Sequence, residues 1–136
     1  MRWTWEELKE MKTGTVLEMG EIDGVQYVIM RASASLVAYL GVPLDHPLAG
    51  KSYDNIGLAC HGGLTFGGKG DGKYRPAGVY WYGWDYAHFK DAIFYDNWIS
   101  GEDIKHYFED VKADVEKLIP EFLELMAGAE KSNKGE

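Results

Sequence analysis

Apolar residues recur in steps of three and four near the C-terminal end of the chain, from Ile104 to Met126. This spacing places them on one face of an amphipathic helix. We predict a single helix that has Ser100 as its N-cap and ends at Gly128. Pro120 removes a backbone donor, so a kink is expected there. The polar residues 129–136 are predicted to form a flexible tail.

The middle of the chain has the pattern of short strands. Segments rich in β-branched and aromatic residues predict strands over 15–19, 25–30, 33–42 and 79–85. The first two form a hairpin, because Gly24 closes a turn between them. The short apolar run 56–60 predicts one more, buried strand. The glycine-rich residues 66–78 are predicted to be a mobile loop.

Residues 3–12 are predicted to form a short helix, since Thr4 and Glu7 have the spacing of a capping box. The order of helix, strands and helix favours the α+β class. We therefore expect a single domain over residues 1–128, with a mostly antiparallel sheet packed by the kinked C-terminal helix.

Composition narrows the class of partner. The 136 residues suit one domain, and 14 basic against 22 acidic residues give a net charge of −8. Such a chain is a poor binder of duplex nucleic acid. We expect no membrane partner and a cytoplasmic location, because no apolar run is long enough to span a bilayer and no secretory pattern precedes the first helix. A homo-oligomer is left open.

Four histidines offer the clearest candidate chemistry, since phosphate-loop, nucleophile-elbow and zinc-protease motifs do not occur. His46, His61 and His88 lie in loops or at strand ends, each near a carboxylate. With Asp91 they could bind a divalent metal such as zinc. Alternatively an aspartate orients a histidine as general base, or the histidines only brace loops. His106 is interpreted as a surface residue of the C-terminal helix.

A second set of residues suits a small anionic or nucleotide-like ligand. Two glycines after His61 allow the backbone to approach an anion, although a tight bend explains them equally well. Side chains alternate along the strand 79–85, so Tyr80, Tyr82 and Trp84 are predicted on one face and Trp81 and Asp85 on the other. One face joins the core; on the other, Trp81 could stack a base beside Asp85, although a second core layer is the alternative. Cations of the glycine-rich loop could close over the ligand. The candidate ligand-binding residues are His61, Gly62, Gly63, Thr65, Lys69, Lys73, Arg75, Trp81, Trp84, Asp85 and His88.

Three ordered motifs resemble a family of small proteins from bacteria and their phages. They read H-P-L-x-G-x-x-Y-D over 46–54, H-G-G-L-T-F over 61–66 and G-W-D-x-A-H-x-x-D over 83–91. The resemblance implies no particular reaction. It gives added weight to six residues, namely His46, Asp54, His61, Asp85, His88 and Asp91. If the chain is phage-encoded, its expected location is the host cytoplasm.

The function that we favour from the sequence is binding of a small ligand without a cofactor, and catalysis is left open. By analogy with small phage proteins that inhibit host defence, the ligand would be a nucleotide-derived signal that the protein sequesters. One alternative is a metal-dependent hydrolase of a phosphoester-type substrate, with His46, His61, His88 and Asp91 as ligands. A second alternative is a protein-interaction module without a small ligand.

Overall fold

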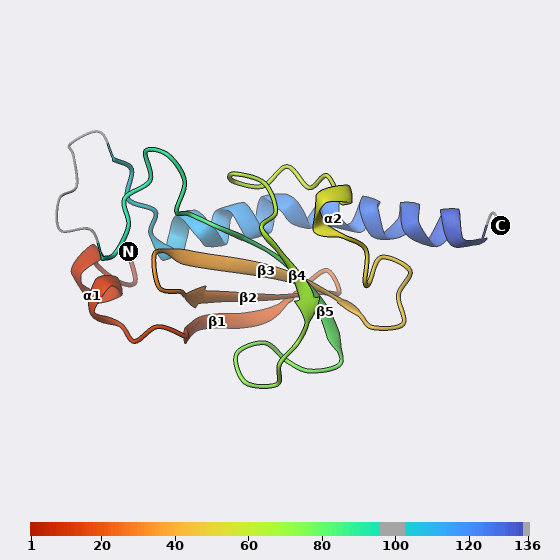
Figure 1. Cartoon of the computed structure of the whole chain (residues 1–136), viewed down its shortest axis with the longest axis horizontal. Coiled ribbons are helices and arrows are strands. Elements are labelled where there is room, and N and C mark those ends of the chain that lie inside the picture. Colours follow the sequence, from red (N-terminus) through yellow and green to blue (C-terminus); the bar gives the residue numbers. More distant parts are fainter. Residues whose placement is uncertain (96–102, 135–136) are drawn as a thin grey trace.

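The computed structural model describes residues 1–95 and 103–134. It confirms the α+β class: a five-stranded antiparallel sheet in the order β1-β2-β3-β5-β4, with α2 along one face and the short α1 at one end (Figure 1). The elements are α1 (Trp5–Glu10), β1 (Thr15–Ile22), β2 (Val25–Arg31), β3 (Leu36–Pro43), the 3-10 helix η1 (Tyr53–Asn55), β4 (Phe66–Lys69), β5 (Val79–Asp85) and α2 (Phe108–Lys134).

Helix α1 has the predicted capping box. The Thr4 hydroxyl accepts from the backbone N–H of Glu7 (3.1 Å), and the Glu7 carboxylate accepts from the backbone N–H of Thr4 (3.0 Å). Its other end is closed by the buried Arg31 of β2, whose guanidinium donates to the carbonyls of Leu8 (3.0 Å) and Lys9 (2.7 Å). These bonds satisfy backbone groups that a helix end otherwise leaves unpaired.

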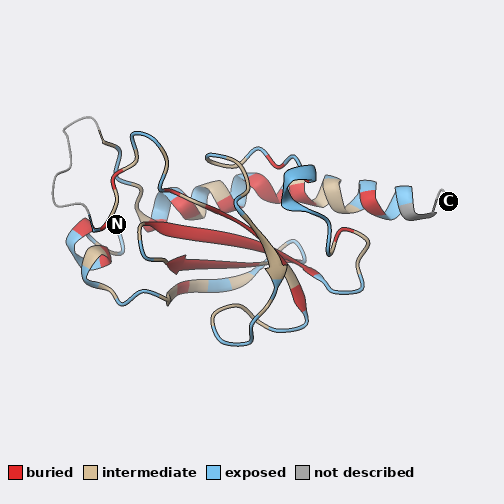
Figure 2. Ribbon diagram, viewed as in Figure 1, coloured by how far each residue is buried: buried red, intermediate tan, exposed pale blue. Residues whose placement is uncertain are grey.

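The main core lies between the sheet and α2. Figure 2 shows buried positions alternating with exposed ones along α2. From Phe108 onward the predicted stripe is this buried face, and Val111, Val115 and Phe122 are completely shielded from solvent; Ile104, its predicted first member, lies before the helix and is exposed. From the sheet, Tyr82 and Trp84 of β5 enter the same cluster. The side-chain alternation predicted for β5 is therefore correct.

The opposite face of the sheet has a smaller core. It contains Val28, Met30, Val37, Tyr39, Val79 and Trp81. The loop between β4 and β5 covers it: Tyr74 packs against the cluster, and Trp81 Nε1 donates to the carbonyl of Pro76 (3.0 Å). The predicted mobile loop over 66–78 is wrong at its start, because Phe66–Lys69 forms β4 and pairs with β5.

Helix α2 begins later than predicted. Ser100 lies outside the described residues, and the helix starts at Phe108. The preceding segment is extended, since the backbone N–H of Ile104 donates to the carbonyl of Lys90 (2.8 Å). Tyr107 is the residue before the helix, and its N–H donates to the Asp110 carboxylate (2.8 Å). This bond is the acidic half of a capping box.

Helix α2 also ends later than predicted. It continues through Pro120 as one helix, passes Gly128 and reaches Lys134. Ala129 is buried against the core, which favours helix beyond the glycine. The predicted flexible tail is thus helical through Lys134, while residues 135–136 lie outside the described part. No helix in residues 1–95 and 103–134 is long and apolar enough to cross a membrane.

The strand predicted over 56–60 does not form. Ile56 and Leu58 are buried as expected, but Gly57 between them has φ +73°, in the left-handed region. That backbone conformation interrupts an extended strand. The segment instead carries the chain from η1 to the turn that contains His61.

Candidate functional site

The buried carboxylate of Asp91 is the centre of a cluster of polar side chains. Its side chain is 4% exposed. His61 Nε2 donates to one oxygen at 2.8 Å and His106 Nε2 to the other at 2.8 Å. The backbone N–H of His88 donates to the same oxygen as His61 (3.0 Å). Three segments far apart in the sequence therefore meet at one carboxylate.

Backbone pairing between two of these segments fixes Asp91 and His106. Asp91 forms a parallel bridge with Ile104, flanked by bonds from the Ile104 N–H to Lys90 O and from the Ala92 N–H to Ile104 O (both 2.8 Å). His106 follows Ile104 by two residues. The bridge thus holds the turn after β5 against the residues that precede α2.

Tyr86 forms the apolar support for the third member, His61. The two rings stack, with centroids 4.7 Å apart and an interplanar angle of 16°. The Tyr86 hydroxyl donates to Asp114 of α2 (2.6 Å) and accepts from Trp84 Nε1 (3.0 Å). Burial raises the pKa of Tyr86, and the hydrogen bond to Asp114 raises it further. Tyr86 therefore stays protonated and positions His61.

Asp91 remains ionised in spite of its burial. Burial raises the pKa of the Asp91 carboxyl, but the hydrogen bonds from His61, the His88 backbone and His106 outweigh it and hold the pKa below its ordinary value. A carboxylate that accepts several hydrogen bonds is stabilised in its charged form. The cluster thus has an anionic centre flanked by two imidazoles.

His88 and Asp85 lie beside this cluster. The rings of His61 and His88 are 5.6 Å apart. His88 Nε2 is 3.0 Å from an Asp85 oxygen but is not aligned for a hydrogen bond with it. The Asp85 carboxylate accepts instead from the Thr65 hydroxyl (3.0 Å) and the Ala87 N–H (3.1 Å). The structure therefore brings together His61, Thr65, Asp85, His88 and Asp91 from the predicted sets.

His46 does not join the cluster, contrary to the predicted metal set. Its Nε2 pairs with Glu130 near the end of α2 (2.8 Å), and its Nδ1 accepts from the Leu48 N–H (3.0 Å). Glu130 is sixteen residues beyond Asp114, which is about 24 Å along a helix. His46 therefore fastens its loop to α2, and His106 stands in the cluster instead.

The two tryptophans proposed to stack a ligand are inaccessible. Trp81 is 0% exposed and Trp84 is 1% exposed, on opposite faces of β5. Both belong to the core. The second face of β5 therefore carries a second core layer, which was the alternative to a ligand-stacking surface. A flat ligand would need another aromatic surface.

The proposed cationic lid does not lie over His61. Lys69 is in β4, and Lys73 lies over the ring of Tyr74, on the loop that covers the second face of the sheet. Arg75 packs over Tyr39 and Phe66 in that same cluster. Lys73 and Arg75 therefore lie on the other side of the sheet from the turn at 61–63, whereas Lys69 pairs with Tyr80 on the α2 side.

The sequence interpretation missed three members of the site, namely Tyr86, His106 and Asp114. His106 was assigned to a helix that in fact starts two residues later. The acidic pair Glu109 and Asp110 was an available signal, because acids concentrate in the first turn of a helix. That signal would have placed His106 in the preceding loop.

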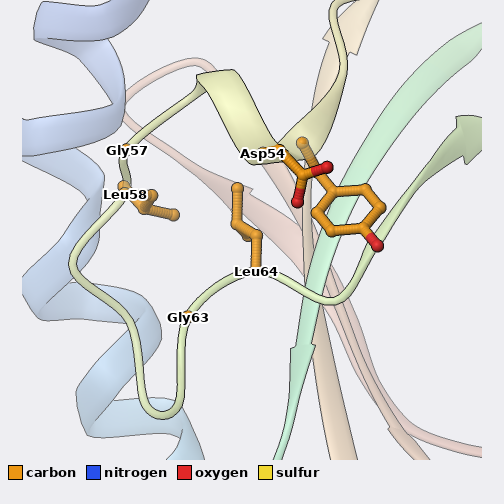
Figure 3. A pocket seen from close by; sticks show the side chains of 6 residues that line it. Asp54, Gly57, Leu58, Gly63 and Leu64 are labelled. Atoms are coloured by element: carbon orange, nitrogen blue, oxygen red, sulfur yellow. The ribbon is translucent and has the colours of Figure 1, made fainter.

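Two pockets flank the turn at His61. One has a volume of about 460 Å³ and is lined by His61, Ile104, Lys105, His106, Asp110, Ala113 and Asp114. The other has a volume of about 230 Å³ and is lined by Tyr53, Asp54, Gly57, Leu58, Gly63 and Leu64 (Figure 3). A bond from the Gly63 N–H to Cys60 O (3.0 Å) closes the turn between them.

Comparisons with models of known protein families, with curated proteins and with solved structures found no match. The resemblance indicated by the three motifs therefore stays a prediction. Function is argued below from the site itself, because a fold alone does not define an activity.

Proposed function

We propose that the protein is a metal-dependent hydrolase of a phosphoester-type substrate, with His61, Asp91 and His106 as ligands of a divalent ion such as Zn²⁺. The observation that supports it is the convergence of two imidazoles and a carboxylate, whose ligand atoms lie within 4.8 Å of one another. Two histidines and a carboxylate are a ligand set found in catalytic zinc sites, which keep a further position open for water or substrate.

The ligand atoms around Asp91 suit such an ion if they move slightly apart. The two N···O separations of 2.8 Å are those of hydrogen bonds. Neighbouring ligands of a tetrahedral zinc ion are about 3.3 Å apart, given bonds of about 2.0–2.1 Å. Metal binding would replace the two shared protons and move the ligands apart by about half an ångström. Tyr86 and the His88 N–H would keep His61 and Asp91 oriented during this change.

The cluster can be reached from the larger pocket, which favours a catalytic role over a purely structural one. His61 and His106 both line the larger pocket, and Lys105 lines it beside them. A bound divalent ion would lower the pKa of a water molecule there. In hydrolysis the water oxygen forms a bond to phosphorus, the ester P–O bond breaks, and the leaving oxygen takes up a proton. Lys105 would contribute positive charge near the phosphoryl oxygens.

Hydrolysis of bis(p-nitrophenyl) phosphate tests this proposal. We expect activity that is lost on treatment with EDTA and restored by Zn²⁺. His61→Ala and His106→Ala should reduce it by about 100-fold or more, because each removes a ligand. His46→Ala is the matched control, since His46 also pairs with a carboxylate but outside the cluster. Activity that survives EDTA, or that is equal in the His106 and His46 variants, would contradict the proposal.

The small-ligand function favoured by the sequence, including sequestration of a nucleotide-derived signal, stays a prediction. The observation that favours it is the smaller pocket, which contains Asp54 and adjoins the turn at His61. A protein-interaction role without a ligand also stays untested.

A further inference from the structure

The smaller pocket has the size of a single ring. Its volume of about 230 Å³ is below the roughly 300–1,000 Å³ typical of pockets that enclose a drug-sized ligand. Figure 3 shows Asp54 on one side of the pocket and Leu58 on the other, with Leu64 between them. An entire nucleotide does not fit in this space, but one planar ring does.

The pocket combines apolar, aromatic and anionic surfaces. Leu58 is buried beneath it, and Tyr53 is 36% exposed with its side chain over Gly67 of β4. Within the described part of the chain, the Asp54 carboxylate forms no hydrogen bond or ion pair. A carboxylate is an acceptor through both oxygens, so it selects a ligand edge that presents donors.

Two glycines leave the backbone of the pocket open. Gly57 and Gly63 have φ of +73° and +81°, and a Cβ at either position would meet no atom within 4 Å. Both adopt a conformation that favours glycine, and neither places a side chain in the space beside Asp54. The pocket is therefore accessible to a ring that approaches the main chain closely.

We infer that this pocket binds a guanine-type ring, held by Asp54 and by contact with Tyr53 and Leu64. Guanine carries two neighbouring N–H donors on one edge, which match the two oxygens of a carboxylate. Adenine carries an acceptor beside its amino group on the corresponding edge, and this acceptor would face the negative charge of Asp54. Stacking on an aromatic ring adds affinity without distinguishing the bases.

The position of the pocket links this ring to the proposed reaction. Gly63 lines the pocket, and His61 is two residues away in the same turn. A guanine nucleotide with its base beside Asp54 could extend its phosphate toward His61. This link rests on the proposed hydrolase function, whereas binding of the ring does not.

Calorimetric titration with GMP, IMP and AMP tests the inference on protein treated with EDTA. We expect GMP to bind about tenfold or more tightly than AMP, with IMP between them because it lacks the amino group. Asp54→Asn should weaken GMP binding by about tenfold, and Tyr53→Ala should also weaken it. Asp45→Asn is the matched control, because Asp45 is an exposed carboxylate of the same loop.

Equal affinity for GMP and AMP, unchanged GMP binding in the Asp54 variant, or no GMP binding at about 1 mM would overturn the inference. Circular dichroism checks that the Asp54→Asn, Tyr53→Ala and Asp45→Asn variants keep the fold. Zinc binding without GMP binding overturns only the ring pocket. GMP binding without zinc binding supports the ring pocket and overturns only the metal-dependent function.

Discussion

The imidazole of His88 packs directly against Gly62, where a Cβ would lie 2.2 Å from His88 Nε2. This contact joins the turn at 61–63 to the turn at 88–91. The first turn supplies His61 and the second supplies Asp91, so the contact helps to hold the two partners at 2.8 Å. A side chain at position 62 would push the turns apart.

Gly62→Ala should therefore destabilise the protein more than Gly63→Ala. Both glycines have positive φ, +69° and +81°, so both variants incur the left-handed backbone penalty of about 1–2 kcal/mol. Only the Gly62 variant also clashes, which adds about 1–3 kcal/mol. Urea unfolding of the two variants measures the difference. Equal losses would show that the His88 contact does not constrain the turn.

Truncation of the buried face of α2 should reduce stability strongly. Phe108→Ala and Leu118→Ala each remove a buried side chain, and each should cost about 2–5 kcal/mol. Leu44→Ala removes an exposed leucine and should cost well under 1 kcal/mol. The free energy of unfolding from urea titration is the measurement. Losses below about 0.5 kcal/mol in both helix variants would mean that the core lies elsewhere.

Arg75 should contribute to stability, although the sequence suggested a ligand-binding cation. Its guanidinium carbon lies 4.9 Å and 4.5 Å from the ring centroids of Tyr39 and Phe66, and its side chain is 14% exposed. Arg75→Ser should lower the free energy of unfolding by about 0.5–2 kcal/mol. Lys69→Ser, at an exposed position, should change it little. If Arg75→Ser leaves the free energy of unfolding unchanged, Arg75 does not anchor the loop and the assignment is wrong.

Asp71 organises the same loop and gives it a pH dependence. Backbone N–H groups of Arg75, Tyr74 and Lys73 donate to its carboxylate and lower the pKa of Asp71 to about 2. The folded pKa is thus below the unfolded value of about 3.9. The resulting stabilisation is complete above pH ~4 and is lost as the pH falls toward ~2.

Asp71→Asn should accordingly be less stable than the wild type at pH 5, and the difference in free energy of unfolding should shrink as the pH is lowered. Carbon-13 NMR of the carboxyl group measures the pKa directly. A titration midpoint near 4 would show that the three backbone bonds do not persist in solution.

The sequence was informative where burial leaves a local pattern. The period of the residues from Phe108 to Met126 predicted the buried face of α2, and alternation along 79–85 predicted the two faces of β5. The predicted ends of α2 were wrong because the apolar period continues into the exposed Ile104, which lies before the helix, and because the helix passes Gly128. Tyr107 and Asp110 decide the start through a single hydrogen bond.

The candidate site could be predicted only in part, because its assembly is non-local. His61, Asp85, His88 and Asp91 were identified from their positions at strand ends and turns. His106 required knowledge of the bridge between Asp91 and Ile104, which no local spacing reveals. His46, like His61, is a loop histidine with a carboxylate nearby in the sequence, yet pairing with Glu130 removes it from the site.

The central claim is that His61, Asp91 and His106 hold one divalent ion, and zinc titration by calorimetry tests it most directly. The wild type and His46→Ala should each bind one Zn²⁺ per chain, whereas Asp91→Ala and His106→Ala should bind it about 100-fold more weakly or not at all. Thermal unfolding without zinc checks that the variants are folded. Wild-type protein that binds no zinc, or a His106 variant that binds it as tightly as the His46 variant, would contradict the claim.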